Sequence, residues 1–215
     1  MCIRDRSKLA ATDDPCGCRL LAGGILLGLA DAVAYENQTY YHHGLKAQLG
    51  DLGTMSRLPD RFLDGYLSVV GSRTVSQIKD ACETLIATTG EWLDCAITVA
   101  DDPDEPDAGM PPPQAIDFRQ LAEDYGETIS TFNKVYSACS SGNAALAFIS
   151  AVCLQEPLSD VFPGIDLDVL SAYDAADLRR YADHVRDVEA ELVTYIEGGA
   201  PITRYASVDE FLRKN

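Results

Sequence analysis

The residues best suited to chemistry lie together in one stretch, from 35 to 46. It holds three tyrosines, a glutamate, a lysine and two of the chain's three histidines. The candidate ligand-binding residues are Tyr35, Glu36, Tyr40, His42, His43 and Lys46. Residues three or four apart are neighbours on a helix, so Glu36, Tyr40 and His43 would share one face and the other three a second face. The stretch predicts the polar wall of a pocket or, alternatively, a helix whose aromatic residues pack while its histidines and lysine meet solvent.

Residues of these types could take part in acid–base chemistry or could bind a charged ligand. His43 could act as a general base, because imidazole titrates near neutral pH. His42 and Lys46 could meet an anionic group of a nucleotide or of another small molecule. Neither Glu-x-x-His nor His-x-x-x-His accompanies these residues, so we expect no metal site. The chain also lacks G-x-G-x-x-G, G-x-x-x-x-G-K-[ST] and G-x-S-x-G, so the sequence identifies no catalytic residue and no cofactor.

A second pattern that could do chemistry is Asp166-Leu-Asp168. Its spacing looks like that of the paired aspartates that hold magnesium in nucleotidyltransferases. A site of that kind needs a Gly-Ser turn just upstream and a strand to carry the acids, but Gly71-Ser72 lies far away in the chain and the residues after Asp168 have a helical pattern. We therefore expect no metal ion at these two aspartates.

The composition is that of a globular and strongly acidic protein. The chain has 215 residues, of which 47% are apolar, enough to bury a core. The 34 acidic and 17 basic residues leave a net charge of -17, which argues against nucleic-acid and anionic membrane partners because both need clustered cations. The seven cysteines are an odd number without the regular spacing of a disulfide scaffold, so we predict reduced thiols and a cytoplasmic location.

The elements that must position these residues are helices. Apolar residues recur at helical rather than alternating spacing, so we predict an all-α fold, a bundle of about six to eight helices with an acidic, Pro-rich connector in the middle. Thr74 and Gln77 form a capping box that starts one helix, and Pro157 is expected to end another. Helices are expected at residues 19–49, 62–71, 75–96, 118–139, 144–156 and 178–197.

The composition divides the chain into four segments that form one domain overall. They are a disordered or artefactual leader at 1–18, a helical half at 19–100, the acidic linker at 101–115 and a second helical half at 116–215. The first seven residues resemble a leader that arises when sequencing adapters are translated, so we expect the natural chain to continue upstream. The apolar run at 20–30 predicts a buried first helix or a signal peptide, since a membrane span needs about 20 residues.

Two stretches resemble parts of the helical domains that accompany a nucleotidyltransferase fold in bacterial and archaeal proteins. The first is Gly-Leu-Ala-Asp-Ala-Val at 28–33 running into Tyr-Tyr-His-His-Gly-Leu-Lys at 40–46, and the second is the helix from Thr74 to Trp92. The resemblance implies a helical domain that closes over the nucleotide or the acceptor substrate. Because the Gly-Ser turn and the Asp-x-Asp core of that family are not in place, it implies no catalysis by this chain alone.

Two functions from different classes follow. The first is a helical accessory or substrate-binding domain of a nucleotidyltransferase-like protein, with a nucleotide or another small molecule bound at residues 35–46. The second is an independent helical-bundle interaction protein, which could form a homodimer and whose acidity serves solubility or a salt-rich environment. Neither function involves nucleic acid or a membrane.

Overall fold

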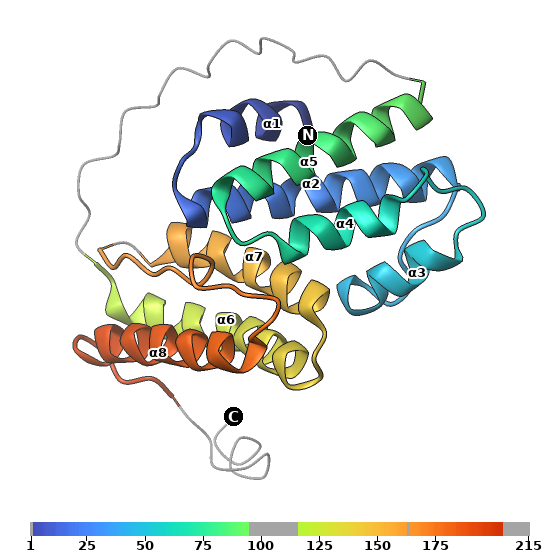
Figure 1. Ribbon diagram of the computed structural model, residues 1–215. Helices are drawn as coiled ribbons and strands as arrows, with labels where there is room; N and C mark the ends of the chain where they lie inside the picture. Colours follow the sequence, from blue (N-terminus) through green and yellow to red (C-terminus); the bar gives the residue numbers. More distant parts are fainter. Residues whose placement is uncertain (1, 95–115, 163, 204–215) are drawn as a thin grey trace.

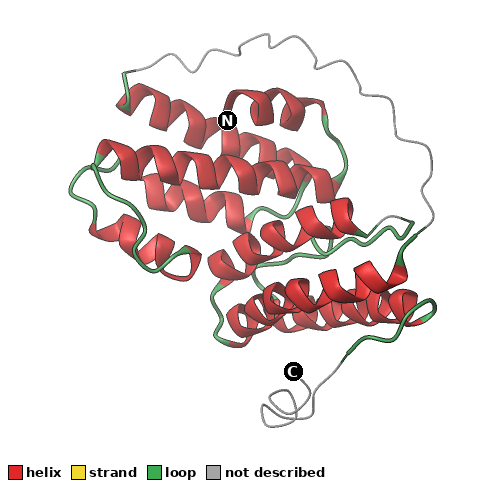
Figure 2. Cartoon of the chain, turned by 180° about the vertical axis from the view of Figure 1, so that it is seen from behind, coloured by secondary structure: helices red, strands yellow, loops and turns green. Residues whose placement is uncertain are grey.

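The computed structural model describes residues 2–94, 116–162 and 164–203. Within these ranges the fold is all helical, without a strand, as predicted (Figure 2). The helices are α1 (Cys2–Ala11), α2 (Pro15–Glu36), α3 (Gln48–Thr54), α4 (Phe62–Gly71), α5 (Val75–Trp92), α6 (Phe118–Ser140), α7 (Ala144–Val161) and α8 (Leu178–Glu197), with a short 3-10 helix, η1 (Leu45–Ala47), before α3.

The helices form two groups that meet at α7 (Figure 1). Helices α1 to α5 make one group, in which α2 packs against both α1 and α5. Helices α6 to α8 make the other, in which α6 packs against both α7 and α8. Contacts of α7 with α2 and α4 join the two groups, so α2 and α7 are the central pair of the bundle.

Local sequence signals explain where most of these helices begin. The predicted capping box is present, because the Thr74 hydroxyl accepts from the Gln77 amide while the Gln77 side chain accepts from the Thr74 amide. Asp14, Asn143 and Asp177 cap α2, α7 and α8. The side-chain oxygen of each accepts from the backbone amide three residues further on. The buried residues of α8 recur at helical spacing and form one apolar stripe: Tyr181, Ala182, Val185, Val188, Leu192 and Ile196.

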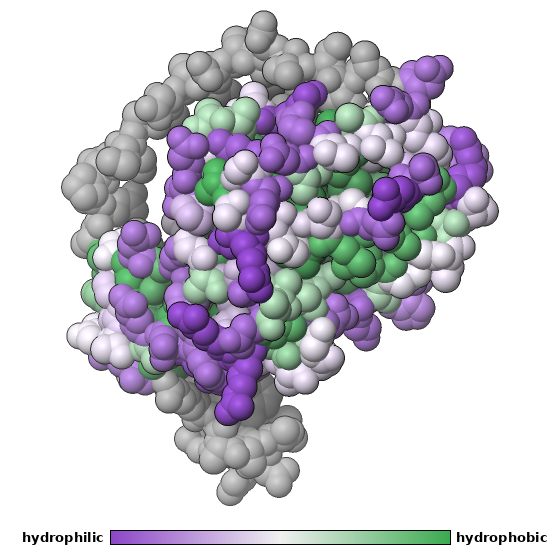
Figure 3. Space-filling model, in the orientation of Figure 1, coloured by the Kyte–Doolittle hydropathy of each residue, from purple (hydrophilic) through white to green (hydrophobic). Residues whose placement is uncertain are grey.

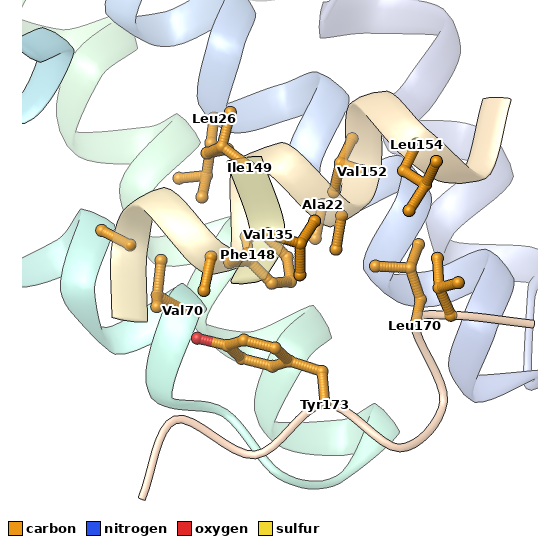
Figure 4. Packing of buried hydrophobic residues seen from close by; sticks show 14 of the residues in the cluster. Ala22, Leu26, Val70, Val135, Phe148, Ile149, Val152, Leu154, Leu170 and Tyr173 are labelled. Atoms are coloured by element: carbon orange, nitrogen blue, oxygen red, sulfur yellow. The ribbon is translucent and has the colours of Figure 1, made fainter. Parts of the chain in front are cut away.

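The closest approach of the central pair is at Gly23 of α2. A methyl group on Gly23 would lie 2.3 Å from Cγ2 of Val152 in α7. Figure 4 shows the surrounding core, where Ala22 and Leu26 of α2 face Ile149 and Val152 of α7. The absence of a side chain at Gly23 therefore sets the distance between the two helices.

Both central helices are long and apolar enough to cross a membrane by length and composition. About half of the apolar window of each is buried inside the fold, and the core helices of soluble proteins and signal sequences pass the same test. The apolar run at 20–30 lies wholly within α2. The cytoplasmic location and the absence of a membrane partner stay predictions.

Three sequence-based expectations are wrong. Residues 2–18 are not disordered, because α1 and the start of α2 occupy most of them and Leu9 and Cys18 are buried, whereas the alternative of an artefactual leader stays a prediction. Residues 19–49 are not one helix, because α2 ends at Glu36. Pro157 does not end α7, which continues to Val161 because Leu158 and Phe162 are anchored in the core. The predicted linker at 101–115 lies outside the described residues.

The connection from α7 to α8 runs through the core and is held by polar side chains. The Gln155 side chain donates to the Leu167 carbonyl at 2.8 Å and accepts from the Val169 amide at 2.9 Å. Arg19 of α2, which is 4% exposed, donates to the carbonyls of Ser171 at 3.0 Å and Tyr173 at 3.1 Å. These bonds satisfy backbone groups that would otherwise be buried without partners.

Substituting Gly23→Ala should destabilise the protein by about 1–3 kcal/mol, because Val152 is β-branched and cannot turn away from the new methyl group. Thermal unfolding should show a lower Tm. Gly50→Ala is the matched control, since Gly50 has open space around it and the change should be neutral or slightly stabilising. Val152→Ala in the Gly23→Ala background should restore part of the loss. An unchanged Tm for Gly23→Ala would contradict this account of the central contact.

Arg19→Ala should cost about 2–4 kcal/mol in urea unfolding, because the carbonyl of Tyr173 would lose its donor in the core and the carbonyl of Ser171 would lose a part-buried bond. The exposed Arg179 on α8 provides the control, and its replacement by alanine should change stability by less than about 0.5 kcal/mol. Equal effects of the two substitutions would show that Arg19 does not hold the connection in place.

Candidate functional site

The predicted site residues do not lie on one helix. Tyr35 and Glu36 are the last two residues of α2, and residues 37–44 form a loop before η1. The chain turns at Gln38, whose φ is 52°, and again at Gly44, whose φ is 64°. The two helical faces that the spacing predicted therefore do not exist.

Five of the six residues are exposed to solvent, and Glu36 is half-buried. Tyr35 and Tyr40 are 76% and 68% exposed, and His42, His43 and Lys46 are exposed as well. Glu36 forms an ion pair with Arg57, with 2.5 Å between Oε1 and Nη1. Lys46 borders a separate hollow of about 20 Å³, which has room for about one water molecule.

Two of the six residues, Tyr40 and His42, do line a common cavity, which we call the loop cavity. Its volume is about 370 Å³, and it lies between the α2–α3 loop and α3. The rings of Tyr40 and His42 are 4.3 Å apart at their centres and tilted by 44°. The complete lining is Asn37, Thr39, Tyr40, His42, Asp51, Thr54, Met55 and Ser56.

The loop cavity is held together by Asn37, which follows the end of α2. The Asn37 side chain donates to the Val33 and Arg57 carbonyls, at 2.8 and 2.6 Å. Its oxygen accepts from the Arg57 amide at 3.0 Å and from the Ser56 hydroxyl at 3.3 Å. One amide group thus connects the end of α2 to the segment after α3, and this connection brings the two walls of the cavity together.

The loop that borders the cavity is fixed by Tyr41. Its hydroxyl donates to the carbonyl of Ala30 at 2.5 Å. Burial raises the pKa of Tyr41 well above its usual value, and the nearby carboxyl groups of Asp31 and Asp51 raise it further. Tyr41 is therefore a neutral donor over the physiological pH range, and it anchors the loop to α2.

Asp51 is the unusual member of the lining. Its Oδ2 atom is buried and has no hydrogen-bond partner in the part of the chain that the structure describes. A buried carboxylate oxygen without a donor is costly, since the net value of a hydrogen bond to a charged group is about 1.5–3 kcal/mol. A ligand that brought an N–H or O–H donor to this oxygen would recover that energy.

A second hollow, the α6–α8 groove, has a volume of about 1370 Å³. Its lining combines apolar and small residues with charges of both signs, and it includes residues 200–203, which follow α8. Glu189 of α8 accepts hydrogen bonds from the hydroxyls of Tyr125 and Tyr136. Burial and the bond to Glu189 raise the pKa of Tyr136 well above its usual value. The charged residues of the lining are Arg119, Glu123, Arg186 and Glu189.

An apolar area of the surface lies over α4, where hydrophobic atoms gather in Figure 3. The side chain of Leu67 on α4 is 47% exposed. Much of the rest of that face is hydrophilic. The area is not hollowed by any of the cavities described above, so it adds no candidate ligand site.

The two aspartates of Asp166-Leu-Asp168 have different surroundings. The Asp168 carboxylate accepts from the amides of Leu170 and Ser171, both at 2.8 Å, and so stabilises its own turn. Asp166 is exposed and does not share this arrangement. In the described ranges, no group of three or more His, Cys, Asp or Glu residues is arranged to hold a metal ion.

Cys16 lies beside this turn at the start of α2. Burial raises the pKa of the Cys16 thiol to about 12, and its hydrogen bond to Asp168 contributes to the rise. A thiol with this pKa stays protonated near neutral pH and is a poor nucleophile. Cys16 therefore donates to Asp168 and supports the turn rather than acting as a reactive group.

Comparison with protein-family models, with curated proteins and with solved structures finds no match for this chain. Inferences about function therefore depend on the chemistry of its own cavities and surfaces.

Sequence reasoning found Tyr40 and His42 but missed Asp51 and Asn37. Asp51 is one acid among many in an acidic chain, and nothing in its neighbours indicates that it lines a cavity. Sequence reasoning also missed the α6–α8 groove. A signal for the groove was present, because Arg119 and Glu123, four residues apart, and Arg186 and Glu189, three apart, place opposite charges beside the apolar stripes of two long helices.

Asp168→Asn should weaken the fold at pH 7. Burial alone would raise the pKa of Asp168, but hydrogen bonds from Ser171, Cys16 and Leu170 outweigh this effect. They hold the pKa below the usual aspartate value of about 4. A carboxyl with a lowered pKa stabilises the fold above its unfolded-state pKa, and this contribution disappears as the pH falls through the folded-state pKa. The stability difference between the native chain and Asp168→Asn, measured by urea unfolding, should therefore shrink below about pH 4.

Asp166→Asn is the matched control for this measurement. Because Asp166 is exposed, its variant should follow the native stability curve from acid to neutral pH. Identical curves for the two variants would show that the Asp168 carboxylate does not support the turn.

Proposed function

We propose that the protein is a binding domain that holds the nucleoside part of a nucleotide in the loop cavity. In this proposal it acts as the helical accessory or substrate-binding domain of a nucleotidyltransferase-like protein. The observation that carries the proposal is the buried, unpartnered Oδ2 of Asp51 in the lining of a cavity. A nucleobase supplies the donor that this oxygen lacks, because its ring and exocyclic N–H groups donate to carboxylates.

The size and the lining of the loop cavity suit this ligand. Ligand sites usually have volumes of about 300–1,000 Å³ and a few polar groups that fix orientation. The loop cavity, at about 370 Å³, can hold a base and its sugar but little more. Thr39, Thr54 and Ser56 supply hydroxyl oxygens that can accept hydrogen bonds from a ribose.

The aromatic residues of the loop add a surface for stacking. Base–aromatic stacking is worth about 1–3 kcal/mol per base, and it requires an accessible ring. Tyr40 keeps 68% of its surface exposed although it contacts His42. A base that donates to Asp51 can therefore cover a ring that is otherwise left in water.

The phosphates of a bound nucleotide would have to point out of the cavity. Asp51 is acidic and would repel them within it. His43 and Lys46 are exposed on the same segment of chain, outside the cavity lining, and can meet an anionic group there. Four of the six predicted residues thus keep a role, with Tyr40 and His42 beside the base and His43 and Lys46 near the phosphates. The chemistry of transfer belongs to a separate catalytic domain.

Nucleosides and nucleoside triphosphates should both raise the Tm of the protein. A ligand that binds only the folded state at about 100 times its Kd stabilises it by about 2.7 kcal/mol, which raises the Tm of a chain of this size by about 5–10 °C. Asp51→Ala should abolish the shift by removing the acceptor, and Tyr40→Ala should reduce it. Thermal scans with each of the common nucleosides and their triphosphates, with and without magnesium, measure these effects.

His43→Ala is the matched control, because His43 neighbours His42 in the sequence but does not line the loop cavity. This variant should keep the full shift with nucleosides. Two results would refute the proposal. One is the absence of any shift of the native chain with all of these compounds. The other is a shift that Asp51→Ala and His43→Ala retain equally.

A further inference from the structure

The chain that follows α8 runs directly into the α6–α8 groove. Helices α6 and α8 lie on the side of α7 away from α1 to α5 (Figure 1). They run antiparallel, because Phe118 at the start of α6 contacts Tyr195 near the end of α8. Gly199, just after α8, packs so closely on the Phe118 ring that a side chain there would have no room. Residues 200–203 then line the groove, so the chain enters it at the end where α6 begins.

The hollow continues beyond these four residues. Ala200 is buried and Ile202 packs against the hydrophobic core, so the chain is held where it enters. The groove then extends along both helices, as far as Ile129 of α6 and Arg186 of α8. Residues 119–129 of α6 border it, which is a length of about 15 Å at a rise of about 1.5 Å per residue. The groove is therefore long enough for a short helix.

The next residues of the chain, 204–215, have the pattern of such a helix. They lie outside the described residues, and their sequence is Arg-Tyr-Ala-Ser-Val-Asp-Glu-Phe-Leu-Arg-Lys-Asn. Ser207 and Glu210 have the spacing of a capping box, which would start a helix at Val208. The other apolar residues lie three or four positions from Val208, so all would share one helix face. They are Tyr205, Phe211 and Leu212.

The middle of the groove suits an apolar helix face. Gly126 of α6 has no heavy atom within 4 Å of the position where a side chain would begin. Ala122 and Ala190 are the other small residues of this part of the lining, and Ile129 and Val193 add partly buried apolar surface. Small residues let helices approach to interaxial distances of about 8–10 Å.

The charges of the groove and of residues 204–215 are complementary in their order. Arg119 and then Glu123 border the groove on α6, four residues apart, and no ion pair among the described residues involves either of them. Glu210 and then Lys214 have the same spacing with the opposite signs. A helix that runs in the same direction as α6 therefore brings Glu210 beside Arg119 and Lys214 beside Glu123.

We propose that residues 204–215 bind in the α6–α8 groove of their own chain as a short helix parallel to α6. Because the chain enters the groove at the start of α6, it can follow this direction without reversing. Successive residues are about 100° apart around a helix, so Arg213 lies on the opposite side from Lys214 and meets Glu189 of α8. Two tyrosine hydroxyls already hold the Glu189 carboxylate in position for this contact.

The covalent connection favours this segment over any separate partner. Residue 204 follows directly on residues that line the groove. A segment joined by so short a link has an effective concentration of the order of millimolar. A partner protein could use the groove only by displacing it.

Hydrogen exchange in the full chain, followed by mass spectrometry, tests this binding. The amides of residues 208–214 should exchange at least about tenfold more slowly than in the free peptide 204–215, because so short a helix is not stable alone and a bound one is protected. Gly126→Gln should remove most of this protection by filling the middle of the groove. Gly71→Gln is the matched control, since Gly71 also has open space around it but lies at the end of α4.

Charge reversal tests the proposed orientation. Glu123→Lys and Lys214→Glu should each reduce the protection, because each places like charges side by side. The double variant Glu123→Lys/Lys214→Glu should restore it, because it exchanges the two charges of the same pair. Glu127→Lys is the control, since Glu127 is exposed on α6 but does not line the groove. Circular dichroism and the Tm show whether each variant is folded.

Four results would overturn the inference. One is exchange of residues 208–214 in the native chain as fast as in the free peptide. Another is protection that Gly126→Gln and Glu123→Lys both leave unchanged, which would place the bound segment elsewhere. The third is protection that disappears on dilution of the protein, which would make the same segment of a second copy the occupant. The fourth is a double variant no better protected than its single variants, which would exclude this orientation.

Discussion

The contact between α2 and α7 is the constraint on which the rest of the structure depends. Each of the two helices belongs to a different group, and they are the main link between the groups. Their approach is set by Gly23, whose missing side chain leaves space that Val152 fills. Any side chain there would move α7 and, with it, the helices α6 and α8 that it carries. The position of the α6–α8 groove relative to the loop cavity follows from this one contact.

The buried arginine makes the central contact specific. Hydrophobic packing alone would allow α2 to slide or rotate against its neighbours with small loss. Arg19 removes this freedom, because its donors must reach the carbonyls of Ser171 and Tyr173 in the connection between α7 and α8. Burial lowers the pKa of Arg19, but an arginine stays charged near neutral pH, so the requirement for these acceptors persists. A misplaced α2 would leave a buried cation without them.

Helical periodicity predicted the all-α class and most of the helices, because amphipathic stripes such as that of α8 report directly on burial. The candidate site could be predicted only in part. The end of α2 at Glu36 depends on Asn37, whose side chain bonds the backbone of Arg57, twenty residues away. No glycine or proline marks this boundary, so local sequence could not show it. The cavity that includes Asp51 exists because of the same distant bond.

The loop cavity and the α6–α8 groove belong to different helix groups. The loop cavity is built from the end of α2, the following loop and α3, whereas the α6–α8 groove is built on the far side of α7. The shared requirement is again the α2–α7 contact, because it holds the two helix groups together and a change at Gly23 alters stability without contacting either surface.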